Sequence, residues 1–75
     1  MTAKEMFEKL GYKYTKYGND IEFNKQFEYA EVKIYFADFA KTIEISSDKD
    51  ITFTIDIEEL QAINKQVEEL GWNER

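Results

Sequence analysis

The chain lacks cysteine, histidine and proline altogether, and it contains only three glycines in 75 residues. Without cysteine no disulfide can form, and without cysteine and histidine the usual ligands of zinc and haem iron are missing. The same absences remove the strongest nucleophile and the side chain that most often transfers protons near neutral pH. We therefore expect no enzymatic activity, no cofactor and no zinc or haem site.

Calcium and magnesium bind to carboxylates, so these absences leave such sites open. Asp48-Lys49-Asp50 has the acidic spacing with which a calcium loop begins. A calcium loop also needs a glycine at its sixth position, which here is Phe53, a residue with the pattern of a buried strand. We interpret the segment from Ser46 to Asp50 as a hairpin turn, and we expect no metal site.

Long apolar runs are missing too, since none approaches the roughly 20 residues that a membrane-spanning helix requires. The first residues, Met1-Thr2-Ala3-Lys4-Glu5, lack the basic-then-apolar pattern of a signal peptide. We therefore expect a cytoplasmic protein without a membrane partner. The length fits one small globular domain spanning residues 1–75, with a core of marginal size.

The net charge of −6 is unevenly distributed along the chain. Residues 1–41 carry equal numbers of lysines and acids, whereas residues 42–75 carry the whole negative excess. This excess repels a phosphate backbone, so nucleic-acid binding is disfavoured there. Several of these acids form a predicted solvated helix face, namely Glu58, Glu59, Glu68 and Glu69. Recognition of a basic partner is the alternative interpretation, and it makes Glu58 and Glu69 candidate interface residues.

Two segments, residues 2–11 and 56–71, have the signals of complete amphipathic helices. Each begins with a capping box, in which Thr2 or Asp56 caps the helix and the glutamate three residues later reaches back. Each ends at a glycine followed by an aromatic residue, which is typical of a Schellman stop. The buried apolar stripe expected for the second helix consists of Leu60, Ile63, Val67 and Leu70.

Between the helices, apolar and polar side chains alternate, which indicates antiparallel strands with one buried face. The apolar positions are Ile21, Phe23, Val32, Ile34, Phe36, Ile43, Ile45, Ile51, Phe53 and Ile55. Turns are expected at Gly18-Asn19 and at Asp38 to Lys41, whereas residues 24–31 fit a loop, a bulged strand or an edge. The sequence predicts a two-layer α+β fold: a helix, a four- or five-stranded antiparallel sheet and a second helix, with both helices on one face.

Aromatic side chains are abundant, and some of them alternate away from the predicted buried face. These candidate interface residues are Tyr14, Tyr17, Phe27, Tyr29 and Tyr35. Exposed aromatic rings on a sheet can anchor a protein interface or stack on bases. Neighbouring acids offset the neighbouring lysines and no ribonucleoprotein signature is present, so a protein partner is favoured over nucleic acid. The alternative is that these aromatic side chains have no binding role and pack in a second small cluster or against neighbours across the strands.

Both ends of the chain resemble a known group of proteins. Residues 1–12, MTAKEMFEKLGY, resemble the opening of short uncharacterised proteins encoded by phages and prophages of low-GC Gram-positive bacteria. Residues 59–72, ELQAINKQVEELGW, resemble their close. The resemblance covers both helices and leaves out most of the strands. It implies an accessory phage-type protein in the cytoplasm of a bacterial host, and it adds weight to binding of a host protein.

The sequence thus favours a small acidic, non-enzymatic, protein-binding module that acts on a host protein. A structural homodimer without a ligand is the first alternative, because the core is small and a free edge strand can pair with a second copy. A single-stranded nucleic-acid binder that uses the tyrosines of the sheet is the second alternative.

Overall fold

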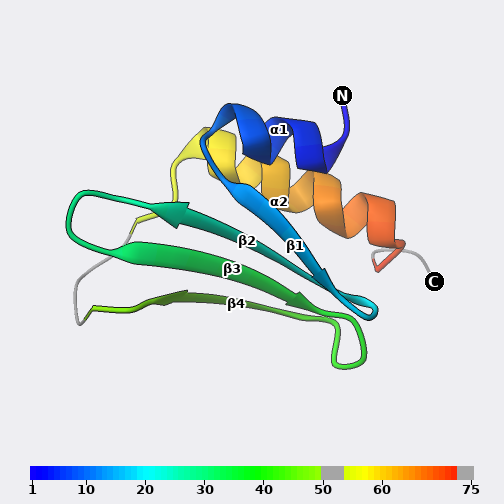
Figure 1. Ribbon diagram of the computed structural model, residues 1–75. Helices are drawn as coiled ribbons and strands as arrows, with labels where there is room; N and C mark the ends of the chain where they lie inside the picture. Colours follow the sequence, from blue (N-terminus) through cyan, green and yellow to red (C-terminus); the bar gives the residue numbers. More distant parts are fainter. Residues whose placement is uncertain (50–53, 73–75) are drawn as a thin grey trace.

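The computed structural model describes residues 1–49 and 54–72. Its elements follow the chain in the order α1 (Ala3–Lys9), β1 (Lys13–Tyr17), β2 (Asp20–Gln26), β3 (Glu31–Ala37), β4 (Thr42–Ser47) and α2 (Ile57–Leu70). The four strands form one antiparallel sheet in the order β1-β2-β3-β4. Both helices cover one face of the sheet (Figure 1), so the predicted two-layer α+β fold is confirmed. Neither helix in these residues has the length and apolar character that crossing a bilayer requires.

Both predicted capping boxes are present. In α1 the Thr2 hydroxyl accepts the Glu5 N–H (3.1 Å), and the Glu5 carboxylate accepts the Thr2 N–H (2.8 Å). In α2 the Asp56 carboxylate accepts the Glu59 N–H (2.8 Å), and the Glu59 carboxylate accepts the Asp56 N–H (3.1 Å). Each box satisfies backbone donors that the first turn of a helix leaves unpaired, which fixes where the helix begins.

Both helices also end as expected, at a glycine with positive φ. After α1, Gly11 (φ 93°) lets the Tyr12 N–H donate to the Phe7 carbonyl (3.0 Å). After α2, Gly71 (φ 74°) lets the Trp72 N–H donate to a carbonyl of the last turn (3.2 Å). The Tyr12 ring packs edge-on against Phe7, with 5.4 Å between the ring centroids. These Schellman motifs turn each aromatic residue back towards the core.

The hairpins resolve how residues 24–31 fold, which the sequence left open. Asn24 to Gln26 complete β2, and the Phe27 N–H donates to the Ala30 carbonyl (2.7 Å) across a tight turn. The predicted two-residue turn at Gly18-Asn19 joins β1 to β2. Short hairpins therefore connect all neighbouring strands, and the sheet is a simple meander.

The core is a cluster of aromatic rings between the two layers. Phe7 of α1 stacks on Phe23 of β2 with ring centroids 3.9 Å apart, and Phe36 of β3 meets both rings edge-on. Trp72 closes the end of the cluster, 6.2 Å from Phe36. Burial of such large rings supplies a large part of the stability that a chain this short can reach. The buried members of the cluster are Phe7, Tyr12, Ile21, Phe23, Ile34, Phe36, Ala62 and Ile63.

The buried stripe of α2 differs from the predicted one. Ile63 is buried, and Val67 and Leu70 are half-buried against the core, as expected. Leu60 is 45% exposed, so its predicted place in the buried stripe is wrong. The residues of α2 that are buried are Glu59, Ala62, Ile63 and Gln66.

Glu59 explains this rotation of the helix. It is buried, so the prediction that it belongs to a solvated face is also wrong. Its carboxylate accepts the hydroxyl of Tyr12, which belongs to the core cluster and follows the end of α1. This bond turns the Glu59 side of α2 inward, and Leu60, about 100° further round the helix, comes to lie on the flank.

Strand β4 also departs from the prediction. Ile43 and Ile45 pair with Phe36 and Ile34 and therefore face the helix layer with them. Their side chains nevertheless remain 36% and 42% exposed, so the predicted burial of this strand is wrong. The reason is that β4 lies at the edge of the sheet, and no strand of the described residues lies beyond it.

The possible fifth strand of the prediction centres on Ile51 and Phe53, which lie outside the described residues. Its last residue, Ile55, belongs to no strand. Ile55 lies in an irregular segment directly before α2 and packs half-buried against the core. The described sheet therefore has four strands.

Candidate protein-interaction surface

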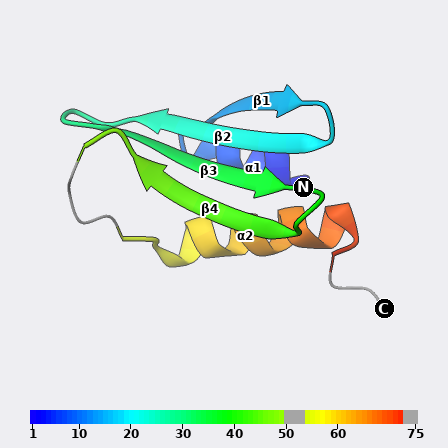
Figure 2. The same cartoon turned by 90° about the horizontal axis from the view of Figure 1, so that it is seen from below.

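One face of the sheet carries no helix, and we call it the open face (Figures 1 and 2). Directly paired residues of antiparallel strands point to the same side, so the register assigns each strand residue to a face. The charged members of the open face are the acids Asp20, Glu22, Glu31 and Glu44 and the lysines Lys13 and Lys33. Its other members are Thr15, Tyr17, Asn24, Gln26, Tyr35, Ala37, Thr42 and Ser46. The open face is therefore polar and more acidic than basic.

Tyr17 of β1 and Tyr35 of β3 lie together on the open face. Their rings stack with an interplanar angle of 29° and 6.4 Å between the centroids. Tyr17 is 52% exposed, and Tyr35 is half-buried beside it. Such a pair offers a flat apolar surface with polar hydroxyl groups, the combination that makes tyrosine frequent at protein interfaces.

Asp20 holds Tyr35 and the next turn in place. Its Oδ2 accepts the Tyr35 hydroxyl (2.6 Å), and its Oδ1 accepts the Asp38 N–H (2.9 Å). These two bonds, that from Tyr35 first, lower the pKa of the Asp20 carboxyl below its ordinary value. The bond to Asp20 is in turn the main reason that the pKa of Tyr35 is raised to about 12. At neutral pH the Tyr35 hydroxyl therefore stays a donor to a charged acceptor.

The turn after β3 carries a fully exposed aromatic side chain. Phe39 lies in the turn of residues 38–41 and has an exposure of 101%. The base of the turn is fixed, because the Asp38 N–H donates to Asp20 and the Asp38 carboxylate accepts the Trp72 indole N–H (3.3 Å). Phe39 is thus presented on a braced turn without any contact that buries it.

The turn that carries Phe39 lies at the same end of the sheet as the Gly18-Asn19 turn that follows Tyr17 (Figure 1). We call Tyr17, Tyr35 and Phe39 the aromatic end. Phe39 was not among the predicted interface residues, because the alternation of apolar residues predicts which way strand residues face and does not apply to turns. The available signal was an aromatic residue inside a predicted turn, where no sheet face can bury it.

The other aromatic candidates lie elsewhere. Tyr14 is half-buried under the helix layer, with its ring 5.5 Å from Phe23 and the Lys4 ammonium 4.9 Å from its centre. Phe27 and Tyr29 are exposed in the turn between β2 and β3, at the opposite end of the sheet. Among the aromatic residues that the sequence singled out, Tyr17 and Tyr35 are a pair whose rings stack on the open face.

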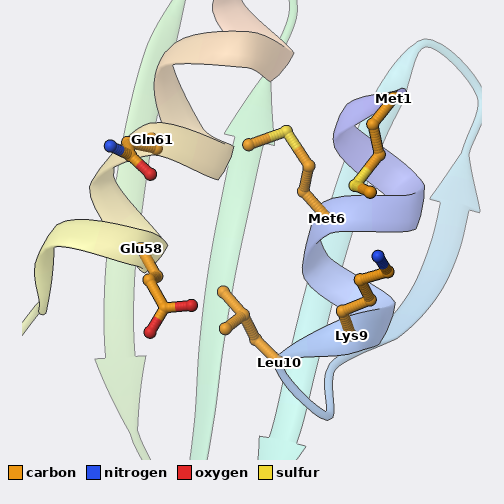
Figure 3. Close-up of a pocket in the computed structure, with 6 residues that line it drawn as sticks. All are labelled: Met1, Met6, Lys9, Leu10, Glu58 and Gln61. Atoms are coloured by element: carbon orange, nitrogen blue, oxygen red, sulfur yellow. The ribbon is translucent and has the colours of Figure 1, made fainter.

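The two acidic candidates, Glu58 and Glu69, belong to the helix layer. The Glu69 carboxylate accepts the Ala3 N–H at the start of α1 (2.8 Å), so it links the two helices. Glu58 borders a shallow pocket of about 150 Å³ between the helices, across from Met6 and Leu10 (Figure 3). Ligand pockets usually measure about 300–1,000 Å³, so this gap is too small for most ligands. Neither acid belongs to the open face.

The buried pair Tyr12 and Glu59 has a structural role. The carboxylate of Glu59 accepts both the Tyr12 hydroxyl and the Asp56 N–H. Burial and then the bond to Glu59 raise the pKa of Tyr12 above its ordinary value. Groups that satisfy one another inside a core stabilise it rather than react. In residues 1–49 and 54–72, no three acidic side chains are grouped so that they could hold a metal ion.

Comparisons of the chain with protein-family models, with curated proteins and with solved structures found no match. The resemblance of the terminal helices to phage and prophage proteins therefore stays a prediction, and so does a location in the cytoplasm of a bacterial host. The geometry of the open face is the remaining guide to function.

Proposed function

We propose that the chain is a non-enzymatic protein-binding module that contacts its partner with the aromatic end. The observation that carries the proposal is the fully exposed Phe39, in a turn at the same end of the sheet as the turn that follows the stacked Tyr17. A few residues usually supply most of the binding energy of an interface, and aromatic residues are enriched among them. In the phage-type setting that the terminal helices resemble, the partner is a protein of the bacterial host.

The braced turn supports binding by Phe39. The Asp38 N–H donates to Asp20 (2.9 Å), and the Trp72 indole donates to Asp38 (3.3 Å), so both layers hold the turn. A side chain on a fixed base loses less conformational freedom when it enters a partner's pocket. Phe39 has the position of an anchor residue, and the stacked tyrosines supply a flat surface on the strands that lead to the same end of the sheet.

The charge around Tyr35 indicates the chemistry of the partner. Glu44 of β4 pairs directly with Tyr35 and is exposed, Glu22 of β2 pairs with Tyr35 on the other side and is 9% exposed, and Asp20 accepts the Tyr35 hydroxyl. Acids around an aromatic surface favour a partner with lysine or arginine at matching positions, and they raise the rate of association with a basic protein. The same acids repel phosphates, so they disfavour single-stranded nucleic acid as the ligand.

Affinity capture with matched variants tests the proposal. Wild-type chain and the variants Phe39→Ala, Tyr17→Ala and Tyr29→Ala are immobilised at equal density and exposed to lysate of a low-GC Gram-positive bacterium. Tyr29 is the control, because it is an exposed aromatic residue at the other end of the sheet. We expect the wild type and Tyr29→Ala to retain the same protein at physiological salt. Retention by the two aromatic-end variants should fall at least about tenfold.

Circular dichroism shows whether each variant is folded before the capture is interpreted. Loss of an exposed aromatic side chain should leave the spectrum unchanged. Retention of the same protein by all variants would contradict the proposed surface. If the wild type retains no protein, the proposed function itself is wrong.

A further inference from the structure

Within residues 1–49 and 54–72, strand β4 has backbone groups along the edge of the sheet that pair with no other strand. The Asp48 N–H donates to the Glu31 carbonyl (3.1 Å), so the backbone groups of Asp48 point towards β3. Antiparallel strands alternate residues that bond to one neighbour with residues that face away from it. The N–H and C=O groups of Ile43, Ile45 and Ser47 therefore point away from β3, where the described residues provide no strand.

The two edges of the sheet differ in their protection. The outer strand β1 carries Lys13 and Lys16, and lysines on an edge discourage pairing with another chain. Strand β4, with the sequence TIEISS, contains no lysine, and the whole chain has no proline to block the edge. In the part of the chain that the structure describes, neither a strand nor a lysine of the strand blocks the edge at β4, whereas the edge at β1 carries two lysines.

An apolar strip runs beside this edge on the helix side of the sheet. Ile43 and Ile45 of β4 are 36% and 42% exposed. Glu58 and Gln61 line the gap towards α1, so Leu60, which is 45% exposed, lies on the other flank of α2. Figure 2 shows α2 running along the β4 side of the sheet. A strand added to β4 would cover the two isoleucines and meet this flank.

We propose that β4 pairs with β4 of a second copy of this chain, antiparallel, with Ile45 opposite Ile45 of the partner. A symmetric pairing that keeps both helix layers on one side must set residues of the same face opposite each other. In the Ile45 register, Ile43 lies opposite the partner's Ser47 and Glu44 lies opposite the partner's Ser46. Of the two neighbouring registers, one would set Glu44 against Glu44 and the other would set Glu44 against Asp48, and like charges directly opposite are unfavourable. The sequence of β4 thus complements itself in one register.

The size of the contact predicts a weak dimer. The outward groups of Ile43, Ile45 and Ser47 give about six backbone hydrogen bonds across the symmetric pair. Interfaces carry about one hydrogen bond per 100–200 Å², so the pair corresponds to roughly 600–1,200 Å² of buried surface. Interfaces of that size are weak or transient, and we expect a dissociation constant on the order of micromolar. The dimer uses the edge of β4, whereas Tyr17 of the aromatic end lies on β1, the strand at the other edge of the sheet.

Sedimentation over a wide concentration range tests self-association. We expect wild-type chain to show a monomer–dimer equilibrium. Ile45→Lys places a charge in the apolar strip and should weaken the dimer at least about tenfold. Tyr29→Lys is the matched control, an exposed aromatic residue replaced by the same charge at the far turn, and it should dimerise like the wild type. A wild type that stays monomeric at hundreds of micromolar, or an Ile45→Lys chain that dimerises as well as the wild type, would overturn the proposal.

Cysteine cross-linking tests the register and does not depend on Ile45→Lys folding. The natural chain has no cysteine, so Glu44→Cys and Ser46→Cys introduce the only thiols. Both side chains are exposed on the open face. In the Ile45 register the two positions face each other as a non-hydrogen-bonded pair about 4.5 Å apart, within disulfide range. We expect mild oxidation to link a mixture of the two variants and to leave each variant alone largely monomeric. Efficient linking of Glu44→Cys to itself, or no linking of the mixture, would refute this register.

The edge and the aromatic end are tested separately. Failure of partner capture by the wild type leaves the sedimentation and cross-linking results valid. A monomeric wild type that still loses its captured protein on Phe39→Ala would reject the dimer and retain the protein-binding function.

Discussion

The hydroxyl of Tyr12 donates to the carboxylate of Glu59 inside the core, across 47 positions of the chain. Tyr12 follows the glycine that ends α1, and Glu59 completes the capping box that begins α2. One hydrogen bond therefore joins the end of the first helix to the start of the second. It also sets the rotation of α2, which decides that Ile63 is buried and Leu60 is exposed.

Removal of either partner of this bond should destabilise the fold. Tyr12→Phe leaves one oxygen of the buried Glu59 without its donor, which costs about 1–3 kcal/mol of the free energy of unfolding. Glu59→Gln should have a cost of the same order. A double-mutant cycle from urea unfolding should give a coupling energy between about 0.5 and 3 kcal/mol. Additive effects of the two substitutions would show that the two side chains act independently.

Tyrosine ionisation should destabilise the protein at alkaline pH. The pKa of Tyr12 is raised by burial and by Glu59, and the pKa of Tyr35 is raised to about 12, mainly by its bond to Asp20. In the unfolded chain both hydroxyls ionise near the ordinary value of about 10. Their contribution to stability is therefore complete below pH 10 and is lost as the pH rises through the folded-state values. Between pH 10 and 12, the unfolding free energy of Tyr12→Phe/Tyr35→Phe should fall less steeply than that of the wild type.

Asp20 should contribute to stability at neutral pH and lose this contribution at acidic pH. The bonds from Tyr35 and Asp38 hold its pKa below the ordinary value of about 3.9. Its contribution is therefore complete above that ordinary value and is lost as the pH falls through the lower folded-state pKa. Asp20→Asn should flatten the loss of stability below about pH 4. It should also speed hydrogen exchange of the Asp38 amide, and an unchanged exchange rate would argue against the braced turn.

Local chemistry made most of the fold predictable from the sequence. The capping residues Thr2 and Asp56 and the stop residues Gly11 and Gly71 act within a few residues of themselves, so their effects can be read along the chain. Apolar alternation similarly identified β2, β3 and β4 as strands, because one side of each strand is apolar.

What the sequence could not give depends on contacts between distant segments. Nothing within β4 shows that it lies at the edge, and that position is why Ile43 and Ile45 are exposed. The apolar spacing of α2 alone predicts that Leu60 is buried. The rotation of the helix is instead set by the hydrogen bond between Tyr12 and Glu59, which are far apart in the sequence. Two residues of the candidate site, Tyr17 and Tyr35, were predicted from the sequence. Phe39 was not predicted, because its exposure follows from the shape of its turn.

A pair of substitutions in α2 tests this rotation. Ile63→Ala removes a buried side chain from the core cluster and should cost about 2–5 kcal/mol of the free energy of unfolding. Leu60→Ala removes a side chain of similar size from the flank and should cost less than about 1 kcal/mol. Chemical denaturation of the two variants compares them directly. Equal costs would mean that Leu60 is as buried as Ile63, contrary to the structure.

The central claim is that Phe39 enters a partner, and site-specific photo-cross-linking measures this most directly. A photoreactive phenylalanine analogue replaces Phe39 in one chain and Tyr29 in a control chain, and each is irradiated in host lysate. We predict one dominant cross-linked protein from position 39 that excess wild-type chain competes away and that position 29 does not yield. Equal labelling from both positions, or labelling from position 39 that wild-type chain does not compete away, would contradict the aromatic end as the binding surface.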